Sequence, residues 1–588
     1  RSVSGDGETL WVGAPFADGA VGAVFAFERD AVSGDWLERA RLTGPGLEFG
    51  DLFGWAVGVS GTHAVAGVAG EDFGAGSAFV YEQNAGSGTW VNAGPLIGSD
   101  EGLAAVVGAR VVCANGMAVS FPCRNADLLA FLPTSAIGGA RGAGVNDLWG
   151  WTDPETGMEV AIVGRSDGTS FVDVSDPVHP VFLGNLLTHS EPSSWRDVKV
   201  HADHAFIVSE APEHGMQVFD LTQLRAVVNP PVTFGETAHY AAFSSAHNIV
   251  VNEESGFAYV VGANSGGETC GGGLHMVNIQ DPVNPLFMGC FADPTTGRAG
   301  TGYTHDAQCV IYHGPDVEHR GREICIGSNE TAVSIADVTD KSAPVALSTA
   351  TYPAASYIHQ GWLTEDHRYF FQDDELDELR QSFSRTRTYI WDLADLDDPQ
   401  LLAEYEGTTP SADHNQYVVG SYVFQSNYAS GLRILDISDV ARPVEVASFD
   451  VFPPHDAAGF NGSWSNYPFF ESGTVIVSGR EAGLFIVEPT GIQVRPPLEP
   501  PASFALQAAY PNPFTDRTSI TVMLPDEQPL SLVAYDVLGR EVARLYEGTL
   551  PAGTYVFPFE AADLAGGTYF VRAKGTGKMQ TQVVILIR

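Results

Sequence analysis

Seven pairs of polar residues recur along the middle of the chain, each opening a short strand-like segment. The pairs are Asn146-Asp147, Arg196-Asp197, His247-Asn248, His305-Asp306, His359-Gln360, His414-Asn415 and His455-Asp456. Neutral imidazole is a ligand for Zn, Cu, Fe or Ni, and neighbouring Asp or Asn side chains can fix the ring tautomers. If the pairs converge, they predict a transition-metal site formed by His247, His305, His359, His414 and His455, together with Asp306.

A structural role is the alternative for these pairs, because such side chains can hydrogen-bond the backbone of an adjacent repeat. Every repeat needs such a bond, whereas a metal needs only three or four ligands. Repetition in all seven units therefore favours the structural interpretation over a metal or ligand site.

A second phrase closes each of these units with an apolar strand and an Asp/Pro turn. Its copies are centred on Asp173, Asp220, Asn278, Asp337, Asp392, Asp436 and, in a worn form, Glu488. The Asp can bond the turn backbone and Pro presets φ. Units of about 50 residues with an opening and a closing strand are typical of four-stranded propeller blades, whose first strands line the central axis. The repeats predict an all-β protein with a seven-bladed β-propeller over 144–490, which would bring the polar pairs together.

An acidic run and several tryptophans are weaker candidates for binding. Asp373, Asp374, Glu375 and Asp377 stand in "FQDDELDELR", and clustered carboxylates can ligate Ca²⁺. The order of an EF-hand loop is absent, so a solvated loop is the favoured alternative. Trp149, Trp151, Trp195 and Trp362 could stack on sugars, but core packing is the simpler role. No catalytic residues are assigned, since no nucleophile motif is present.

Charge and cysteine content limit the environment of the chain. The net charge is −42, from 72 acidic and 30 basic residues, which disfavours nucleic acid as a partner. Six cysteines lie close in sequence as Cys113 and Cys123, Cys270 and Cys290, and Cys309 and Cys325. An even number at these spacings predicts disulfides in an oxidising compartment, although proximity does not prove the pairing. No apolar run is long enough to span a membrane. The start at Arg1, without Met or an apolar leader, suggests a mature or truncated product.

Two copies of a different unit precede the propeller. "GETLWVGAPFADGAVGAVFAFERD" and "GWAVGVSGTHAVAGVAGEDFGAGSAFVYEQ" each place two apolar strands around a Gly/Ala turn. They resemble FG-GAP repeats, with "LFGWAVGV" as the FG portion, and define a segment over 1–105. The Asp-rich calcium loop of many such repeats is missing. A disulfide-containing connector is expected over 106–143.

The C-terminal segment has its own motif order. A Pro-rich linker is expected over 491–504, followed by a small Ig-like β-sandwich over 505–588. Its opening motif, Tyr510, Pro511, Asn512, Pro513 and Phe514, precedes "YDVLG", "GTY", "GTY" and a basic-apolar tail. This segment resembles the type A C-terminal sorting domain of type IX secretion substrates. The resemblance implies the type IX machinery as a partner, and export through the periplasm and outer membrane to the cell surface or beyond.

The stretch from Cys113 to about Glu488 resembles the choice-of-anchor B family, propeller proteins related to LVIVD repeats. The matching phrases include "CANGMAVSFPCRNADLLAFLP", "SSWRDVKVHADHAFIVSEAPEHGMQVFDL" and "HQGWLTEDHRYFFQDDELDE". The family name describes anchoring rather than an activity. We therefore expect a non-enzymatic binding or adhesion protein with a protein or glycan ligand. The rivals are a metal-dependent enzyme with a multi-His centre on the axis, and a structural subunit of a surface layer or appendage. A divalent metal, calcium or a His-bound transition metal, is the cofactor that these candidates allow.

Overall fold

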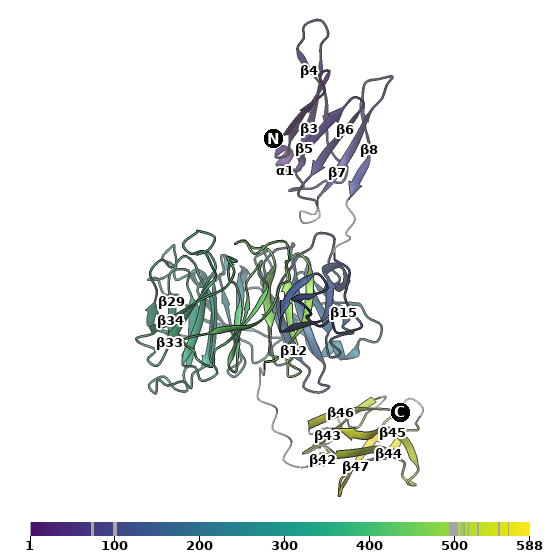
Figure 1. Cartoon of the computed structure of the whole chain (residues 1–588), viewed down its shortest axis with the longest axis vertical. Helices are drawn as coiled ribbons and strands as arrows, with labels where there is room; N and C mark the ends of the chain where they lie inside the picture. The colour runs from purple at the N-terminus through teal and green to yellow at the C-terminus, as the bar shows by residue number, and fades with distance from the viewer. Residues whose placement is uncertain are drawn as a thin grey trace.

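The computed structural model describes residues 2–71, 76–97, 103–492, 504–506, 509, 512–514, 517–525, 528–550, 553–561 and 564–588. Strands make up nearly all regular structure in these ranges (Figure 1). The helical elements are short: α1 (Ala17–Ala20), η2 (Thr134–Ile137), η3 (Leu221–Ala226) and η4 (Cys270–Gly272). The all-β prediction is confirmed. The expected linker over 491–504 lies largely outside the described residues, as do Tyr510 and Pro511 of the sorting motif.

Two four-stranded antiparallel sheets form the N-terminal segment, one for each copy of its repeat. Their strands are β1 (Ser2–Gly5), β2 (Thr9–Ala14), β3 (Ala23–Arg29) and β4 (Trp36–Leu42), then β5 (Phe53–Ser60), β6 (His63–Val68), β7 (Ser77–Gln83) and β8 (Trp90–Ile97). The sheets share one aromatic core, in which the Trp11 and Tyr81 ring centroids are 5.4 Å apart. A Cβ on Gly13 would lie 2.1 Å from the Gly54 carbonyl oxygen, so the close approach of the backbones requires glycine there.

Seven sheets follow between residues 103 and 492 of the described chain, and each is built around four strands in antiparallel order. The first strands are β12 (Val145–Thr152), β16 (Arg196–His201), β22 (Asn248–Asn252), β27 (Asp306–Ile311), β31 (Ile358–Leu363), β35 (Gln416–Val419) and β39 (Ser463–Tyr467). The second strands are β13 (Glu159–Arg165), β17 (His204–Ser209), β23 (Phe257–Val261), β28 (Glu323–Ser328), β32 (Tyr369–Asp374), β36 (Tyr422–Ser426) and β40 (Val475–Gly479). Each first strand packs beside the next one in the series, and β39 also packs beside β12. The arrangement is propeller-like.

The outer strands complete these sheets. The third strands are β14 (Gly168–Asp173), β18 (Met216–Asp220), β25 (Leu274–Asn278), β29 (Val333–Asp337), β33 (Arg387–Asp392), β37 (Leu432–Asp436) and β41 (Gly483–Pro489). The fourth strands are β15 (Val181–Leu187), β20 (Ala238–Tyr240), β26 (Leu286–Phe291), β30 (Val345–Ala350), β34 (Gln400–Glu406), β38 (Val444–Phe449) and β11 (Ala126–Pro133). Short additions are β9 (Met117–Ala118) and β10 (Phe121–Arg124) on β38, β19 (Val232–Phe234) on β15, and the pair β21 (Phe243–Ser245) and β24 (Ser265–Gly267).

The last sheet takes its outer strand from far upstream. Strand β11, within the range expected to be a connector, pairs antiparallel with β41 along its whole length. The buried Phe131 and Phe485 rings contact each other across this pair, tilted by 33° with centroids 4.6 Å apart. Because β11 covers the edge of β41, the two ends of the central region are held together by a sheet.

The closing phrase of each repeat forms the turn that its composition predicts. In six copies the side-chain oxygen at the end of the third strand accepts a hydrogen bond from the backbone N–H two residues later, at 2.8–3.0 Å. These acceptors are Asp173, Asp220, Asn278, Asp337, Asp392 and Asp436. The repeated Asp thus fixes the turn between the third and fourth strands.

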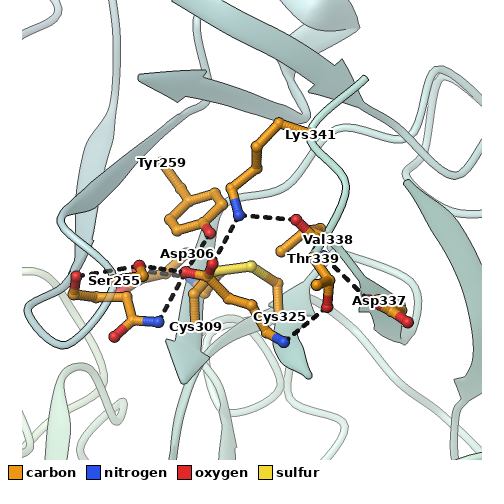
Figure 2. The surroundings of a disulfide bond; sticks show 12 residues. Ser255, Tyr259, Asp306, Cys309, Cys325, Asp337, Val338, Thr339 and Lys341 are labelled. Atoms are coloured by element: carbon orange, nitrogen blue, oxygen red, sulfur yellow. Dashed lines mark hydrogen bonds and ion pairs between the residues drawn. A yellow bond between two sulfur atoms is a disulfide. The ribbon is translucent and has the colours of Figure 1, made fainter. Parts of the chain in front are cut away.

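Three disulfides join the cysteines as Cys113–Cys123, Cys270–Cys290 and Cys309–Cys325. The last one links directly opposed residues of β27 and β28. Figure 2 shows Lys341 and Tyr259 converging beside it. Both donate to the buried Glu323 carboxylate, Lys341 Nζ and Tyr259 OH each at 2.6 Å. The ion pair lies within the sheet of β27 to β30, and the Tyr259 hydrogen bond joins the neighbouring sheet to it.

The C-terminal segment folds as two sheets around one core. One sheet holds β42 (Ala505–Leu506), β43 (Arg517–Leu524) and β46 (Gly553–Glu560); the other holds β44 (Gln528–Tyr535), β45 (Glu541–Leu550), β47 (Gly567–Gly575) and β48 (Lys578–Leu586). The described part of the sorting motif is tied to β48, because Asn512 Nδ2 donates to the Val583 carbonyl at 2.8 Å and Phe514 packs in the core.

Candidate metal centre

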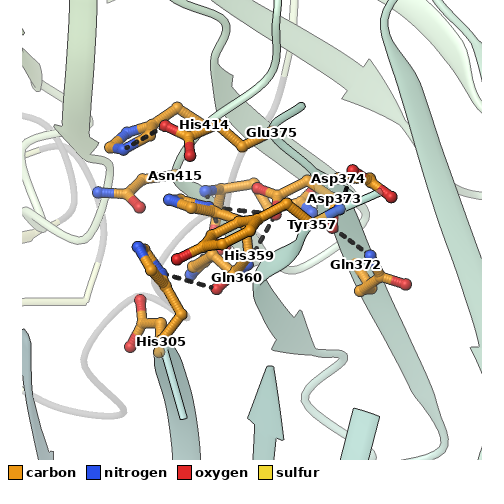
Figure 3. Close-up of polar contacts among 12 residues, drawn as sticks. His305, Tyr357, His359, Gln360, Gln372, Asp373, Asp374, Glu375, His414 and Asn415 are labelled. Carbon is orange, nitrogen blue, oxygen red and sulfur yellow. Dashed lines mark hydrogen bonds and ion pairs between the residues drawn. The ribbon is translucent and has the colours of Figure 1, made fainter. Parts of the chain in front are cut away.

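Four of the five histidines of the repeated pairs meet where the first strands begin. Successive ring centroids are 4.2 Å apart for His247 and His305, 4.3 Å for His305 and His359, and 4.4 Å for His359 and His414. Each ring comes from a different sheet, and the four sheets are consecutive. Figure 3 shows His305, His359 and His414 close together, with Glu375 beside His414.

Each of the four imidazoles has an oxygen atom opposite its Nδ1. His247 Nδ1 lies 2.6 Å from Glu210 Oε1, and His359 Nδ1 lies 3.3 Å from Asp373 Oδ1. His305 and His414 use backbone carbonyls, those of His359 at 3.2 Å and Trp464 at 2.5 Å. Because backbone carbonyls only accept, Nδ1 of His305 and His414 carries the proton and Nε2 keeps its lone pair; ionised Glu210 and Asp373 carboxylates would fix the same tautomer in His247 and His359. This is the arrangement that orients metal-binding histidines.

Burial keeps His305, His359 and His414 neutral. Desolvation lowers the pKa of His305 and His359 well below the usual value, and that of His414 to about 3. The buried His359 Nε2 has no hydrogen-bond partner. A buried lone pair without a donor is unfavourable unless something else occupies it.

Glu375 completes the cluster. Its Oε1 accepts a hydrogen bond from Tyr428 OH at 2.6 Å and lies 3.9 Å from His414 Nε2. Burial raises the pKa of Glu375 to about 7. His359, Glu375 and His414 each present one ligand atom within 4.8 Å of the others. Imidazole nitrogens with one carboxylate form a donor set suited to a first-row transition metal.

His455 lies apart from this group. It contacts Phe452, with ring centroids 5.1 Å apart, and lines a surface cleft together with Pro122 and Asp450. The reason is register: β39 begins at Ser463, and its irregular pairing with β40 matches that of β31 with β32. Trp464 therefore takes the position that His359 has in its own sheet.

The remaining members of the pairs bond neighbouring strands. Asp197 Oδ2 accepts from the Ile249 N–H at 2.8 Å, and Gln360 Nε2 donates to the Gln416 carbonyl at 3.1 Å. Arg196, fully buried, donates through Nε to the Arg165 carbonyl at 3.1 Å. In four pairs the first residue is a clustered histidine. Asp197, Gln360 and Arg196 instead form hydrogen bonds to a neighbouring sheet. The structural interpretation describes these members of the pairs, while metal binding by the clustered histidines stays a prediction.

Asp306 follows His305 but faces a different group. Its carboxyl lies near Lys199 and Asp197, and burial raises its pKa to about 7. Asp306 lines a cavity farther along the first strands.

The acidic run over 373–377 is divided among separate contacts. Asp374 accepts from Tyr352 OH and from the N–H groups of Ser356 and Tyr357, at 2.5–2.6 Å. Asp373 accepts from the Gln360 N–H at 2.7 Å and faces His359. The carboxylates of Asp373, Asp374, Glu375 and Asp377 therefore do not surround one point.

Asp377 points into a separate buried group of carboxyls. Its neighbours there are Glu378 and Asp413, and burial raises the pKa of all three. Oxygens of all three carboxyls are buried without a hydrogen-bond partner.

Glu210 is a partner of the histidine cluster that the repeat pattern did not reveal. It directly follows β17, in "VSE", just as Asp373 and Asp374 end β32. An acidic residue at the end of a second strand is the signal that could have identified it, because this end lies beside the start of the first strand in an antiparallel pair.

Two family models match the chain. The FG-GAP repeat covers residues 36–81 and the secretion system C-terminal sorting domain covers residues 508–587. The predictions of an FG-GAP repeat near the N-terminus and of a C-terminal sorting domain are confirmed. None of the curated proteins matches the chain.

Solved structures show only distant likenesses. A protein from Lactobacillus plantarum is 13% identical with a TM-score of 0.38, over 71% of this chain and 99% of that one. The periplasmic gluconolactonase PpgL of Pseudomonas aeruginosa is 9% identical with a TM-score of 0.39, over 71% and 98%. PorZ, a surface component of the type-IX secretion system of Porphyromonas gingivalis, is 11% identical with a TM-score of 0.31, over 100% and 81%. Likenesses of this size say nothing about function.

The sorting domain marks the chain for export by the type IX machinery to the cell surface or the extracellular space. In the described ranges, no helix has the length and apolar character needed to span a bilayer.

Proposed function

We propose that this exported protein is a metal-binding surface module of the choice-of-anchor B kind. Its central region would be a seven-bladed propeller running from β11 to β41, followed by an Ig-like sorting domain. A first-row transition metal would bind at the propeller axis through Nε2 of His305, His359 and His414 and a Glu375 oxygen, with His247 beside them.

One observation carries the proposal: four adjacent imidazoles each direct Nδ1 at an acceptor and so keep Nε2 available as a ligand atom. The Nδ1 bonds of His247, His305 and His414 reach neighbouring sheets, so one nitrogen of each ring is enough to join sheets and Nε2 is not needed for that role. His359 Nε2 is buried and unpartnered.

The chain's own residues would prepare the site before a metal arrives. Glu210 and Asp373 orient two rings, and Tyr428 holds the Glu375 carboxyl by a 2.6 Å hydrogen bond. Since burial already keeps the three ligand histidines neutral, no proton has to leave them when the metal binds. A bound metal would supply a Lewis-acidic centre, which can hold an oxygen or nitrogen atom of a ligand presented at the cell surface.

Catalysis is the second candidate, and Glu375 is the observation that favours it. In an enzyme, Glu375, whose pKa burial raises to about 7, would take and return protons near neutral pH, and the imidazoles alone would hold the metal. A binding module and an enzyme would share the metal site and differ in turnover. The adhesion role and the surface-layer role expected from the sequence remain alternatives that need no metal.

Metal titration of the purified full-length chain tests the proposal. After treatment with a chelator, calorimetric titration with Zn²⁺, Cu²⁺ or Ni²⁺ should show one tight site per chain, and elemental analysis should agree. His359→Ala combined with His414→Ala should abolish that site, whereas His455→Ala, outside the cluster, should retain it. Absence of the tight site in the unaltered chain, or equal loss in the His455 variant, would overturn the proposal.

A further inference from the structure

A second feature of the same axis is a cavity of about 250 Å³ beyond the histidines. Its walls come from six first strands, β12, β16, β22, β27, β31 and β35, and include Trp149, Lys199, Asp306, Gln360, Trp362 and Tyr417. Asp306 and Gln360 directly follow His305 and His359 in sequence. The cavity thus lies farther along the strands that open with the histidine cluster.

Acidic side chains outnumber basic ones in the lining of this cavity. Lys199 Nζ lies 2.6 Å from Asp197 Oδ1 and 4.0 Å from Asp147 Oδ2, and Asp306 lies close enough to interact with it electrostatically. Asp147 and Asp197 lie outside the lining, which itself holds three acidic side chains, Asp306, Glu253 and Glu254, and one basic side chain, Lys199. Because Lys199 is already paired with Asp197, a bound cation would supply a counter-charge for the carboxyls of the lining.

Aromatic side chains form another part of the lining. Tyr417 packs edge-on against Trp149 and Trp362, with centroids 5.7 and 5.0 Å apart. Lys199 Nζ lies 4.7 Å from the centre of the Trp149 ring, so one aromatic face here already receives an ammonium group. Aromatic faces attract organic cations through their quadrupole, and they also bury methylene groups.

We propose that this cavity binds a small organic cation, an alkyl amine or diamine, with its ammonium group at Asp306 and Glu253 and its methylenes against Trp362 and Tyr417. The volume admits a ligand smaller than a drug-sized molecule. The strongly acidic chain would also raise the local concentration of cations. A neutral sugar could stack on the same rings, but it would leave the excess of carboxyls without a counter-charge.

The cavity does not depend on the proposed metal, because none of its lining residues is a ligand of that site. Loss of metal binding would leave the amine proposal standing, and failure of amine binding would leave the metal proposal standing. The two can therefore be tested separately on the same preparation of the full-length chain.

The test compares matched ligands by calorimetry after chelator treatment. 1,4-Diaminobutane should bind, whereas 1,4-butanediol, of nearly the same size and uncharged, should not. Glucose serves as the sugar probe. Binding of the diol as tightly as the diamine, binding of glucose alone, or binding of none of the three would each overturn the proposal.

Charge-removing variants locate the site. Asp306→Asn keeps the shape of the side chain and should weaken diamine binding about ten- to hundredfold, as expected for loss of a charged hydrogen-bond partner. Glu253→Gln is an independent second variant that should also weaken diamine binding. It keeps the test valid if Asp306→Asn disturbs folding. Asp398→Asn, an exposed position outside the cavity, should leave affinity unchanged. Unchanged affinity in both cavity variants would also refute the assignment.

Discussion

The buried His214 should make the central region sensitive to mild acid. Its side chain is fully buried, Nδ1 donates to the Gly215 carbonyl at 3.1 Å, and Nε2 accepts from Arg196 Nη1 at 2.9 Å. A second proton would have to sit on Nε2, facing the guanidinium. Desolvation, followed by the charge on Arg196, lowers the pKa of His214 from 6.5 to about 3.

The sign and size of the effect follow from linkage. A histidine whose pKa is lowered on folding contributes stability that is complete above its unfolded pKa and is lost as the pH falls. Between pH 7 and pH 5 the unfolded chain takes up nearly one proton at this residue, while the folded chain takes up almost none. The loss is about 2 kcal/mol over that interval.

Urea unfolding followed by tryptophan fluorescence at pH 7 and pH 5 measures this loss. His214→Gln keeps an acceptor for Arg196 but cannot titrate, so its unfolding free energy should fall by about 2 kcal/mol less than that of the unaltered chain. His179→Gln, at an exposed position, is the control and should behave like the unaltered chain. If His214→Gln and the unaltered chain show the same pH dependence, the assignment of a neutral buried His214 is wrong.

Three further predictions concern other parts of the chain. Lys341→Met leaves the buried Glu323 carboxylate without its counter-ion and should lower the unfolding free energy by about 3–5 kcal/mol in chemical denaturation; a change below 1 kcal/mol would contradict the buried pair. A chain starting at residue 134 lacks β11 and exposes the edge of β41, so it should melt at lower temperature and aggregate on heating, whereas a chain starting at residue 106 should not; equal melting curves would show that β11 is dispensable. Deletion of 508–587 should prevent export, so that cell fractionation finds the protein in the periplasm instead of at the surface or in the medium; unchanged export would contradict its sorting role.

The local pattern of the sequence was sufficient for the elements that depend on near neighbours. The Asp turns involve residues two positions apart, so repeated phrases such as that around Asp436 predict both the strand and the turn. The sorting segment and the FG-GAP segment were recognised from motif order, which the family matches confirm. The paired cysteines lie on neighbouring or nearby segments, so their spacing anticipated the disulfides.

Other features depend on contacts between residues far apart in the chain. Strand β11 joins β41 across more than 300 residues, and its alternation of side chains does not reveal which sheet edge it will cover. His455 satisfied the repeat pattern, yet the register of β39 gives its position to Trp464. A shift in register cannot be read from composition, because it is set by packing against the neighbouring sheets.

The histidine cluster shows the same division. The sequence by itself determined that histidines open several consecutive repeats, and hence which rings could meet. Only the tertiary structure decided that His247, His305, His359 and His414 do meet, that Glu210 and Glu375 join them, and that Asp306 faces a different cavity. The physical reason is that ring orientation and burial follow from the positions of several sheets at once, whereas the repeat records each sheet separately.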